Sequence, residues 1–221
     1  SSRCGSADVL EALGVRINIP LQRCGEAIRE IGLGFLFAQA AHSATRHAAL
    51  ARKQIGERTV FNLLGPLTNP AGAHSQLVGV YSPDVLDLMA ATLAELGVQR
   101  AFVVHGADGL DEISLSGETY VAEMNKGVVK RYTVTPQDFG MSRNPIETLR
   151  GGDAQENATL IREVLEGRPG PRRDIAVINA AAALVTAGIA TNFQDGVQLA
   201  STAISSGLAQ KKLAALVAFT N

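Results

Sequence analysis

Two adjacent carboxylates, Asp111 and Glu112, follow a short hydrophobic stretch and a glycine-rich turn in the segment VVHGADGLDEISL, residues 103–115. Two like charges this close repel each other unless water screens them or a cation lies between them. Carboxylate oxygens are ligands that Mg²⁺ prefers, and Mg²⁺ commonly binds one or two carboxylates together with substrate phosphates. The segment therefore has two interpretations: a solvated acidic turn, which the spacing alone favours, or a magnesium site.

A second candidate for ligand binding lies in SSRCGSADVLEALG, residues 1–14, where Ser1, Ser2 and Ser6 surround the start of an expected helix. Hydroxyl groups and free backbone amides at the start of a helix can bind phosphate. The simpler alternative is an ordinary helix cap formed by Ser6 or Asp8, and for this segment alone we favour the cap.

A third candidate is the alanine-rich, basic segment HSATRHAALARKQIG, residues 42–56, which predicts a helix that ends at Gly56. His42 and Arg52 in this helix would lie about 80° apart around its axis, so both could line one edge of a groove. A guanidinium group there can bind a planar carboxylate through two hydrogen bonds. The alternative is a solvated basic face.

The other reactive residue types give no catalytic candidate. His47 and His105 have no partners at a useful spacing, so we interpret both as structural. Cys4 and Cys24 have no activating neighbour in the sequence, so we expect neither to act as a nucleophile.

The elements that must position these residues alternate along the chain. SQLVGVYS (75–82) and RAFVVHG (100–106) predict strands on either side of a helix over 82–97, the βαβ pattern of a parallel sheet. Open α/β sheets bind ligands at the carboxyl ends of their strands. Alternating residues around Asn125–Gly127 predict a hairpin. We therefore expect an α/β fold, with a mainly parallel sheet flanked by helices.

The remaining segments predict helices and loops. Residues 31–40 are compatible with a buried strand or a hinge, and residues 174–188 with a strand that runs into an alanine-rich helix. Gly-Pro and Asn-Pro pairs should end any helix within 59–73 early. The expected helices are those over 6–14, 21–32, 157–167 and 193–221.

Composition limits the function classes. The 221 residues carry a net charge of −1, which gives no electrostatic footprint for nucleic acid or an anionic membrane. The apolar runs are too short and too broken to span a bilayer. Two cysteines make no disulfide framework, so a reducing cytoplasm is the expected location.

Four segments, taken together and in this order, resemble the anthranilate phosphoribosyltransferase family of tryptophan biosynthesis. They are SSRCGSADVLEALG, FLFAQAAHSATRHAALARKQIGERTVFNLLGPLTNPA, VVHGADGLDEIS, and GGDAQENATLIREVLEG with the following RDIAVINAAAAL. The resemblance covers essentially all 221 residues. Its most specific parts are GERTVFNLLGPLTNP and HGADGLDE.

The resemblance implies a transferase that moves the phosphoribosyl group of 5-phosphoribosyl 1-diphosphate to anthranilate and releases diphosphate. It implies that Asp111 and Glu112 bind Mg²⁺ on the diphosphate and that Arg52 binds the carboxylate of anthranilate. It implies no general base, because holding the amine of anthranilate in position should supply much of the rate of transfer. The substrate-binding residues that it implies are Ser1, Ser2, Ser6, His42, Arg52 and Gly65.

The resemblance also implies a fold of the nucleoside phosphorylase/phosphoribosyltransferase type and a full-length homodimer. We expect residues 1–40 and 74–221 to form an α/β phosphoribosyl-diphosphate-binding domain and residues 41–73 to be a segment of a small helical domain. The family's N-terminal helical section has no counterpart in this chain, so we expect these 221 residues alone to be inactive. Ser43 stands where the family commonly has proline.

Two other functions compete with this one. A pyrimidine nucleoside phosphorylase, similar in fold, would use phosphate and need no metal. A non-catalytic relative that binds nucleic acid would need a basic groove, which the balance of 20 Lys and Arg against 21 Asp and Glu does not favour.

Overall fold

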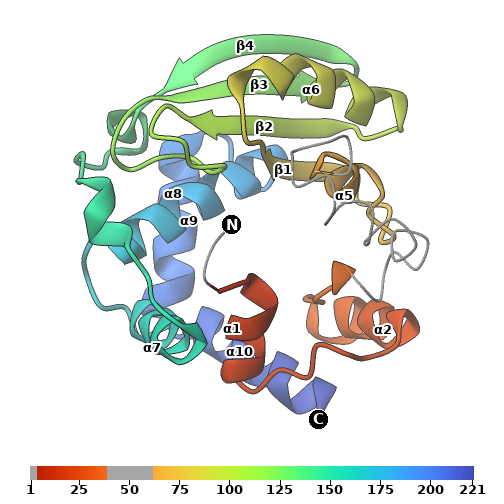
Figure 1. Ribbon diagram of the computed structural model, residues 1–221, viewed down its shortest axis with the longest axis vertical. Helices are drawn as coiled ribbons and strands as arrows, with labels where there is room; N and C mark the ends of the chain where they lie inside the picture. Colours follow the sequence, from red (N-terminus) through yellow and green to blue (C-terminus); the bar gives the residue numbers. More distant parts are fainter. Residues whose placement is uncertain (1–3, 39–61) are drawn as a thin grey trace, which may run out of the picture.

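The computed structural model describes residues 4–38 and 62–221. Its described strands form one four-stranded sheet in the order β1-β2-β3-β4, with helices on both faces (Figure 1). This confirms the α/β fold class. The sheet is mixed rather than mainly parallel: β1 and β2 pair parallel, whereas β2 with β3 and β3 with β4 pair antiparallel. The strands are β1 (Ser75–Gly79), β2 (Arg100–Gly106), β3 (Thr119–Asn125) and β4 (Val128–Val134).

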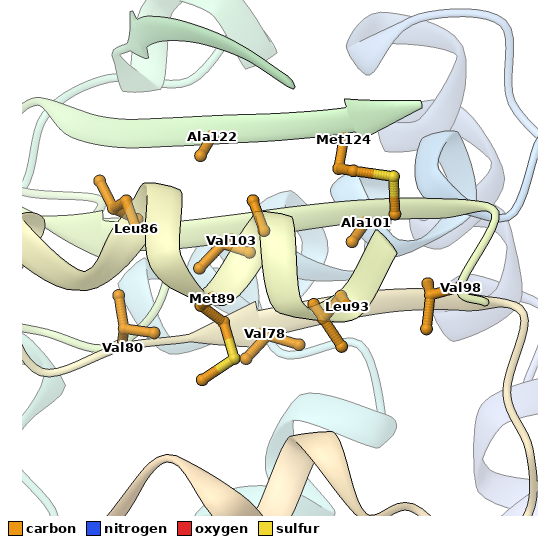
Figure 2. Close-up of a cluster of buried hydrophobic side chains, with 11 residues drawn as sticks. Val78, Val80, Leu86, Met89, Leu93, Val98, Ala101, Val103, Ala122 and Met124 are labelled. Carbon is orange, nitrogen blue, oxygen red and sulfur yellow. The ribbon is translucent and has the colours of Figure 1, made fainter. Parts of the chain in front are cut away.

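The expected βαβ unit is present. A 3-10 turn, η3 (Pro83–Val85), leads into α6 (Leu86–Glu95), and the Ser82 hydroxyl accepts a hydrogen bond from the Asp84 amide at its start. Buried side chains of α6 pack on one face of the sheet (Figure 2). Burying a large aliphatic side chain of this kind contributes about 1.5–3 kcal/mol to the free energy of folding. The labelled members of the cluster are Val78, Val80, Leu86, Met89, Leu93, Val98, Ala101, Val103, Ala122 and Met124.

The expected hairpin is also confirmed. β3 and β4 pair from Thr119↔Val134 to Asn125↔Val128. The two residues between them, Lys126 and Gly127, both have positive φ, 48° and 82°. This is the backbone twist that two-residue hairpin turns favour.

The other face of the sheet is covered by α8 (Pro171–Thr186) and, beside it, α9 (Phe193–Ser205) (Figure 1). The prediction of a strand within 174–188 was wrong, because the whole of this segment up to Thr186 is helical. Pro171 in the first turn and the run of alanines favour a helix. Its β-branched residues lie on the buried face, with Val177 and Ile178 fully enclosed.

The remaining helices lie away from the strands (Figure 1). They are α1 (Ser6–Ala12), α2 (Leu21–Ile31), α7 (Ala154–Leu165) and α10 (Leu208–Thr220), as the helical patterns predict. Short helices complete the described chain: α5 (Leu64–Leu67), η4 (Pro136–Phe139) and η5 (Ile146–Leu149). Helix α5 ends early, at Leu67, as expected for 59–73, although it contains the Gly65-Pro66 pair. Residues 33–37 form no strand, and the predicted helix over 42–56 lies outside the described residues.

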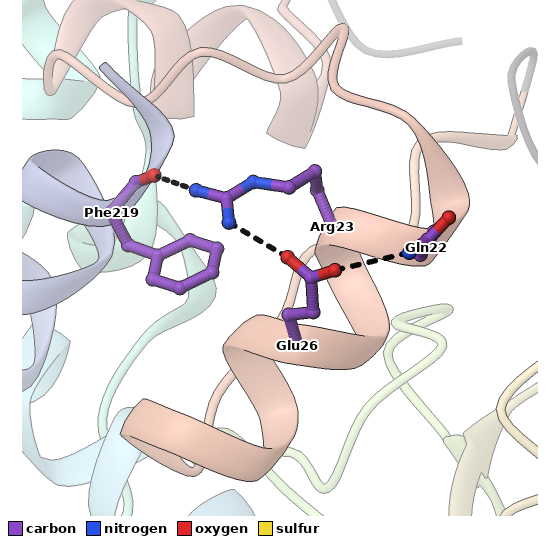
Figure 3. Close-up of polar contacts among 4 residues, drawn as sticks. All are labelled: Gln22, Arg23, Glu26 and Phe219. Atoms are coloured by element: carbon purple, nitrogen blue, oxygen red, sulfur yellow. Dashed lines mark hydrogen bonds and ion pairs between the residues drawn. The ribbon is translucent and has the colours of Figure 1, made fainter.

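A cluster of polar and cation–aromatic contacts connects α2 to α10. The Arg23 guanidinium donates to Glu26 at 2.7 Å and to the Phe219 carbonyl at 3.3 Å, and its Cζ lies 4.2 Å from the centre of the Phe219 ring (Figure 3). Gln22 donates to the other Glu26 oxygen at 3.3 Å. An aromatic face attracts a guanidinium group at this distance. The C-terminal helix therefore holds the second helix of the chain in place.

Candidate functional site

The acid pair lies in the loop that connects β2 to β3. Because β1 and β2 are parallel, their carboxyl ends meet at the same edge of the sheet, and Asp111 and Glu112 lie in the loop that leaves this edge. Both residues are exposed, while the next residue, Ile113, is buried with 1% exposure. The two carboxylates are thus accessible to a ligand at the edge where α/β proteins bind ligands.

The end of β1 contacts the backbone of the acid pair directly. A Cβ atom built on Gly79 would lie 1.6 Å from the Asp111 carbonyl oxygen and 2.5 Å from its carbonyl carbon. No side chain fits at these distances, so glycine allows the close approach. The peptide group of Asp111 is consequently held against the sheet.

Asp108 organises the rest of the loop. Its carboxylate accepts hydrogen bonds from the Ser114 hydroxyl at 2.5 Å, from the Ser116 hydroxyl and from the Leu110 amide at 3.2 Å. Burial acts to raise the pKa of Asp108, but these hydrogen bonds outweigh it and hold the pKa below its ordinary value. Asp108 therefore stays ionised and serves as the internal anchor of the loop.

Helix α8 holds the loop from the other side. The side-chain amide of Asn179 accepts from the Ile113 amide at 2.9 Å and donates to the Ile113 carbonyl at 2.9 Å. The same Nδ2 donates to the Ile175 carbonyl at 3.0 Å. The backbone is therefore fixed on both sides of Glu112, at Asp111 and at Ile113.

The electrostatics of the acid pair favour a bound cation. Partial desolvation by the surrounding chain raises the pKa of Glu112, and the negative charge of Asp111 raises it further. A divalent cation between the carboxylates would remove this repulsion. Within the described ranges, no group of three or more His, Cys, Asp or Glu side chains forms a preassembled metal centre.

The other expected site residues lie on different elements or outside the described chain. Ser6 is the exposed first residue of α1, whose N-cap is Gly5 without a side-chain hydrogen bond. Asp8 accepts instead from the Gly5 amide at 2.8 Å. Gly65 is exposed in α5 with open space around its Cα. Ser1, Ser2, His42 and Arg52 lie outside the described residues.

His105, which we interpreted as structural, and Cys24, which we expected not to act as a nucleophile, both have structural contacts. His105 is buried at the end of β2, and its Nδ1 donates to the Val80 carbonyl at 2.8 Å. Cys24 is buried in α2 and its thiol lies 3.3 Å from the Phe35 carbonyl, and burial raises the pKa of this thiol. A raised pKa disfavours the nucleophilic thiolate. His47 lies outside the described residues.

Sequence reasoning missed Gly79, Asp108 and Asn179, which hold the acid pair without belonging to it. Asn179 gave one usable signal: it is a polar amide alone in INAAAALV, on the face of a helix that is otherwise apolar. Gly79 and Asp108 gave none beyond their residue type, since their partners depend on the folded loop.

No helix in the described parts of the chain has the length and apolar character that crossing a membrane requires.

A family model described as the glycosyl transferase family, a/b domain, matches residues 1–210. The anthranilate phosphoribosyltransferase of Desulfatibacillum aliphaticivorans is 52% identical over 220 residues, covering 100% of this chain and 65% of the relative. The enzyme of that name from Geobacter sulfurreducens is 52% identical over 221 residues, covering 100% of this chain and 63% of the relative.

Solved structures agree with these relatives. Anthranilate phosphoribosyltransferase from Thermus thermophilus superimposes with a TM-score of 0.92 at 49% identity, over 98% of this chain and 64% of that one. A Saccharomyces cerevisiae anthranilate phosphoribosyltransferase in complex with PRPP and Mg superimposes with a TM-score of 0.90 at 27% identity, over 98% of this chain and 63% of that one. The chain spans just under two thirds of the length of these relatives.

Proposed function

The chain belongs to the glycosyl transferase family, a/b domain, and on this premise we propose that the full-length protein is an anthranilate phosphoribosyltransferase. It transfers the phosphoribosyl group of 5-phosphoribosyl 1-diphosphate to the amine of anthranilate, with release of diphosphate, in tryptophan biosynthesis. The observation that carries the proposal is the exposed pair Asp111 and Glu112 at the edge of the sheet where α/β proteins bind ligands. The relatives named above support the choice of substrates.

The donor set fits Mg²⁺. Two exposed carboxylates supply hard oxygen ligands and leave room for the phosphate oxygens that Mg²⁺ commonly shares with its protein ligands. The S. cerevisiae relative is a complex with PRPP and Mg. We assign Asp111 and Glu112 as the residues that hold the metal. The chemistry that Mg²⁺ supplies when bound is stabilisation of the charge that develops on the leaving diphosphate.

The remaining substrate contacts are part of the same proposal. The Arg52 guanidinium binds the carboxylate of anthranilate through two hydrogen bonds. The serines near the start of the chain bind the sugar phosphate, and two further residues line the path of anthranilate. We assign no general base, because holding the amine close to C1 supplies much of the rate. Ser1, Ser2 and Ser6 are the serines that bind the phosphates, and His42 and Gly65 are the residues that line the path of anthranilate.

The same proposal covers the domains and the oligomeric state. Residues 1–40 and 74–221 form the phosphoribosyl-diphosphate-binding domain, and residues 41–73 are a segment of a helical domain. The full-length protein is a homodimer of the cytoplasm. Sedimentation of the purified full-length protein tests the dimer, and a concentration-independent monomer would contradict it.

The assay for the activity measures diphosphate release by the full-length protein with 5-phosphoribosyl 1-diphosphate, anthranilate and Mg²⁺. Asp111→Asn and Glu112→Gln should each lower the rate by about a hundredfold, because each removes charge stabilisation at the leaving group. Glu118→Gln, an exposed acid of the same loop, is the matched control and should keep the wild-type rate. Release of thymine from thymidine and phosphate without metal, or acid-pair variants as active as wild type, would refute the proposal.

A further inference from the structure

The side chain of Asn179 makes a two-point contact with one peptide backbone position, Ile113. Oδ1 accepts from the Ile113 amide and Nδ2 donates to the Ile113 carbonyl, each at 2.9 Å. The third bond, from Nδ2 to the Ile175 carbonyl of the preceding helical turn, fixes the orientation of the amide group. Because only an amide side chain offers an acceptor and two donors here, asparagine suits this position in a way that neither aspartate nor leucine does.

The residue that Asn179 contacts, Ile113, is joined directly to the acid pair by one peptide bond. Ile113 follows Glu112, and its side chain is buried in the cluster that includes Ile178, Ala181 and Ala182 of α8. Both its backbone and its side chain are therefore held by the same helix. On the other side, the Asp111 carbonyl packs against Gly79. The exposed carboxylates project from a backbone segment that is fixed at both ends.

We propose that Asn179 is a positioning residue, which sets the geometry of the Asp111 and Glu112 carboxylates for a divalent cation and the diphosphate bound to it. This inference rests on the proposed function of the acid pair. Asn179 acts through the Ile113 backbone and contacts no substrate. Residues that orient metal ligands in this indirect way typically affect metal affinity by about 10- to 100-fold when they are replaced.

The test measures binding as well as catalysis in the full-length protein. Isothermal titration with 5-phosphoribosyl 1-diphosphate at a series of Mg²⁺ concentrations gives the Mg²⁺ requirement for binding, and steady-state assays give kcat and KM at the same concentrations. Asn179→Leu should raise the half-saturating Mg²⁺ concentration by about tenfold. Excess Mg²⁺ should then restore kcat, with KM for anthranilate unchanged throughout.

A second variant keeps the test valid if Asn179→Leu does not fold. Asn179→Asp retains the acceptor for the Ile113 amide but loses both donors and faces two carbonyl groups with a negative charge. It should also raise the Mg²⁺ requirement. Circular dichroism and the melting temperature report whether each variant is folded.

The chain contains a matched control. Asn157 of α7 accepts from the Gly152 amide at 2.9 Å and donates to the Gly152 carbonyl at 3.1 Å, the same two-point contact in another loop. Figure 1 shows α7 on the side of the molecule away from the strands. Asn157→Leu should lower the melting temperature but leave the Mg²⁺ requirement at the wild-type value.

The outcomes separate the two proposals. If wild type needs Mg²⁺ and the acid-pair variants are inactive, but folded Asn179 variants keep the wild-type Mg²⁺ requirement, the positioning role is wrong and the proposed function stands. The positioning role is equally wrong if Asn157→Leu shifts the requirement as much as Asn179→Leu does. If wild type neither binds the sugar diphosphate nor transfers its phosphoribosyl group, the proposed function itself fails.

Discussion

Gly79 at the end of β1 lies so close to the carbonyl group of Asp111 that a methyl group on its Cα would stand 1.6 Å from the carbonyl oxygen. The atoms on the other side of this contact belong to the backbone, which cannot rotate away as a side chain can. Asp111, a proposed metal ligand, can therefore occupy its position only because residue 79 of the neighbouring strand has no side chain.

Gly79→Ala should therefore displace the loop and lower the free energy of unfolding by about 1–3 kcal/mol, the usual effect of an overpacked contact. Denaturant unfolding of the full-length protein measures this. Gly117→Ala is the control, because a Cβ at Gly117 meets no atom within 4 Å. Equal stability of the two variants would show that the loop tolerates the methyl group.

The α8–α9 contact depends on Gly196. A Cβ at this position would lie 2.8 Å from the carbonyl oxygen of Ala181 and 2.9 Å from its Cα, both backbone atoms. Gly196→Ala should push the helices apart and lower the free energy of unfolding by about 1–3 kcal/mol.

The matched helical control for Gly196 is Gly25 of α2, where the nearest atom to an added Cβ is the Arg29 guanidinium at 3.5 Å. Gly25→Ala should raise stability by up to about 1 kcal/mol, because alanine favours the helix. If both variants changed stability in the same direction, close helix packing at Gly196 would not be the cause.

The stability contributed by Asp108 should depend on pH. Its pKa is lower in the folded chain than in the unfolded chain, since the hydrogen bonds to its carboxylate outweigh the effect of burial. A group of this kind stabilises the fold above its unfolded pKa, about 3.9, and the contribution disappears as the pH falls through the lower folded pKa. Asp108→Ala should therefore destabilise the protein by about 2 kcal/mol at pH 7 and by progressively less toward pH 3.

Unfolding of wild type and variant across this pH range measures the difference, with Glu118→Ala as the exposed-acid control. A difference between wild type and Asp108→Ala that stayed constant down to pH 3 would be incompatible with a lowered pKa.

The Arg23 and Phe219 side chains should show a measurable coupling energy. In a double-mutant cycle with Arg23→Met and Phe219→Leu, we expect about 0.5–1 kcal/mol from the cation on the ring. Phe219→Leu keeps the carbonyl that Arg23 also contacts, so the cycle isolates the ring. The corresponding cycle with Glu26→Gln reports the partly exposed ion pair, which should weaken in high salt. A coupling to Phe219 of zero would rule out the ring contact in solution.

The sequence predicted correctly those helices and turns that are determined by residues close together in the chain. The helix expected over 82–97 in the βαβ unit and the hairpin expected around Asn125–Gly127 are both present in the structure. The first part of α8 was misassigned because Ile175, Val177 and Ile178 favour strands in isolation, whereas burial against the sheet decides the outcome in the folded chain.

In the candidate site, too, local features could be predicted from the sequence and long-range contacts could not. Residue type and place after a strand made Asp111 and Glu112 candidates, although the spacing alone favoured a solvated turn, and neither signal indicated the groups that hold them. Asn179 and Ile113 are 66 residues apart in the sequence, and the contact exists only once α8 has packed on the sheet. Nothing in the pattern around Gly79 indicates that a carbonyl group will lie against it.

The attachment of α10 to α2 and to the segment that follows α1 has a consequence for the order in which contacts form during synthesis. The Arg16 amide donates to Thr220, Asn221 donates to the Gly14 carbonyl, and Arg23 binds Phe219, over sequence separations of 204, 207 and 196 residues. At about 5–20 residues per second, a ribosome needs about 10–40 s to add that much chain. For this interval α2 and the residues that follow α1 lack these native partners, so the contacts that hold α10 can form only after at least 196 further residues have been added.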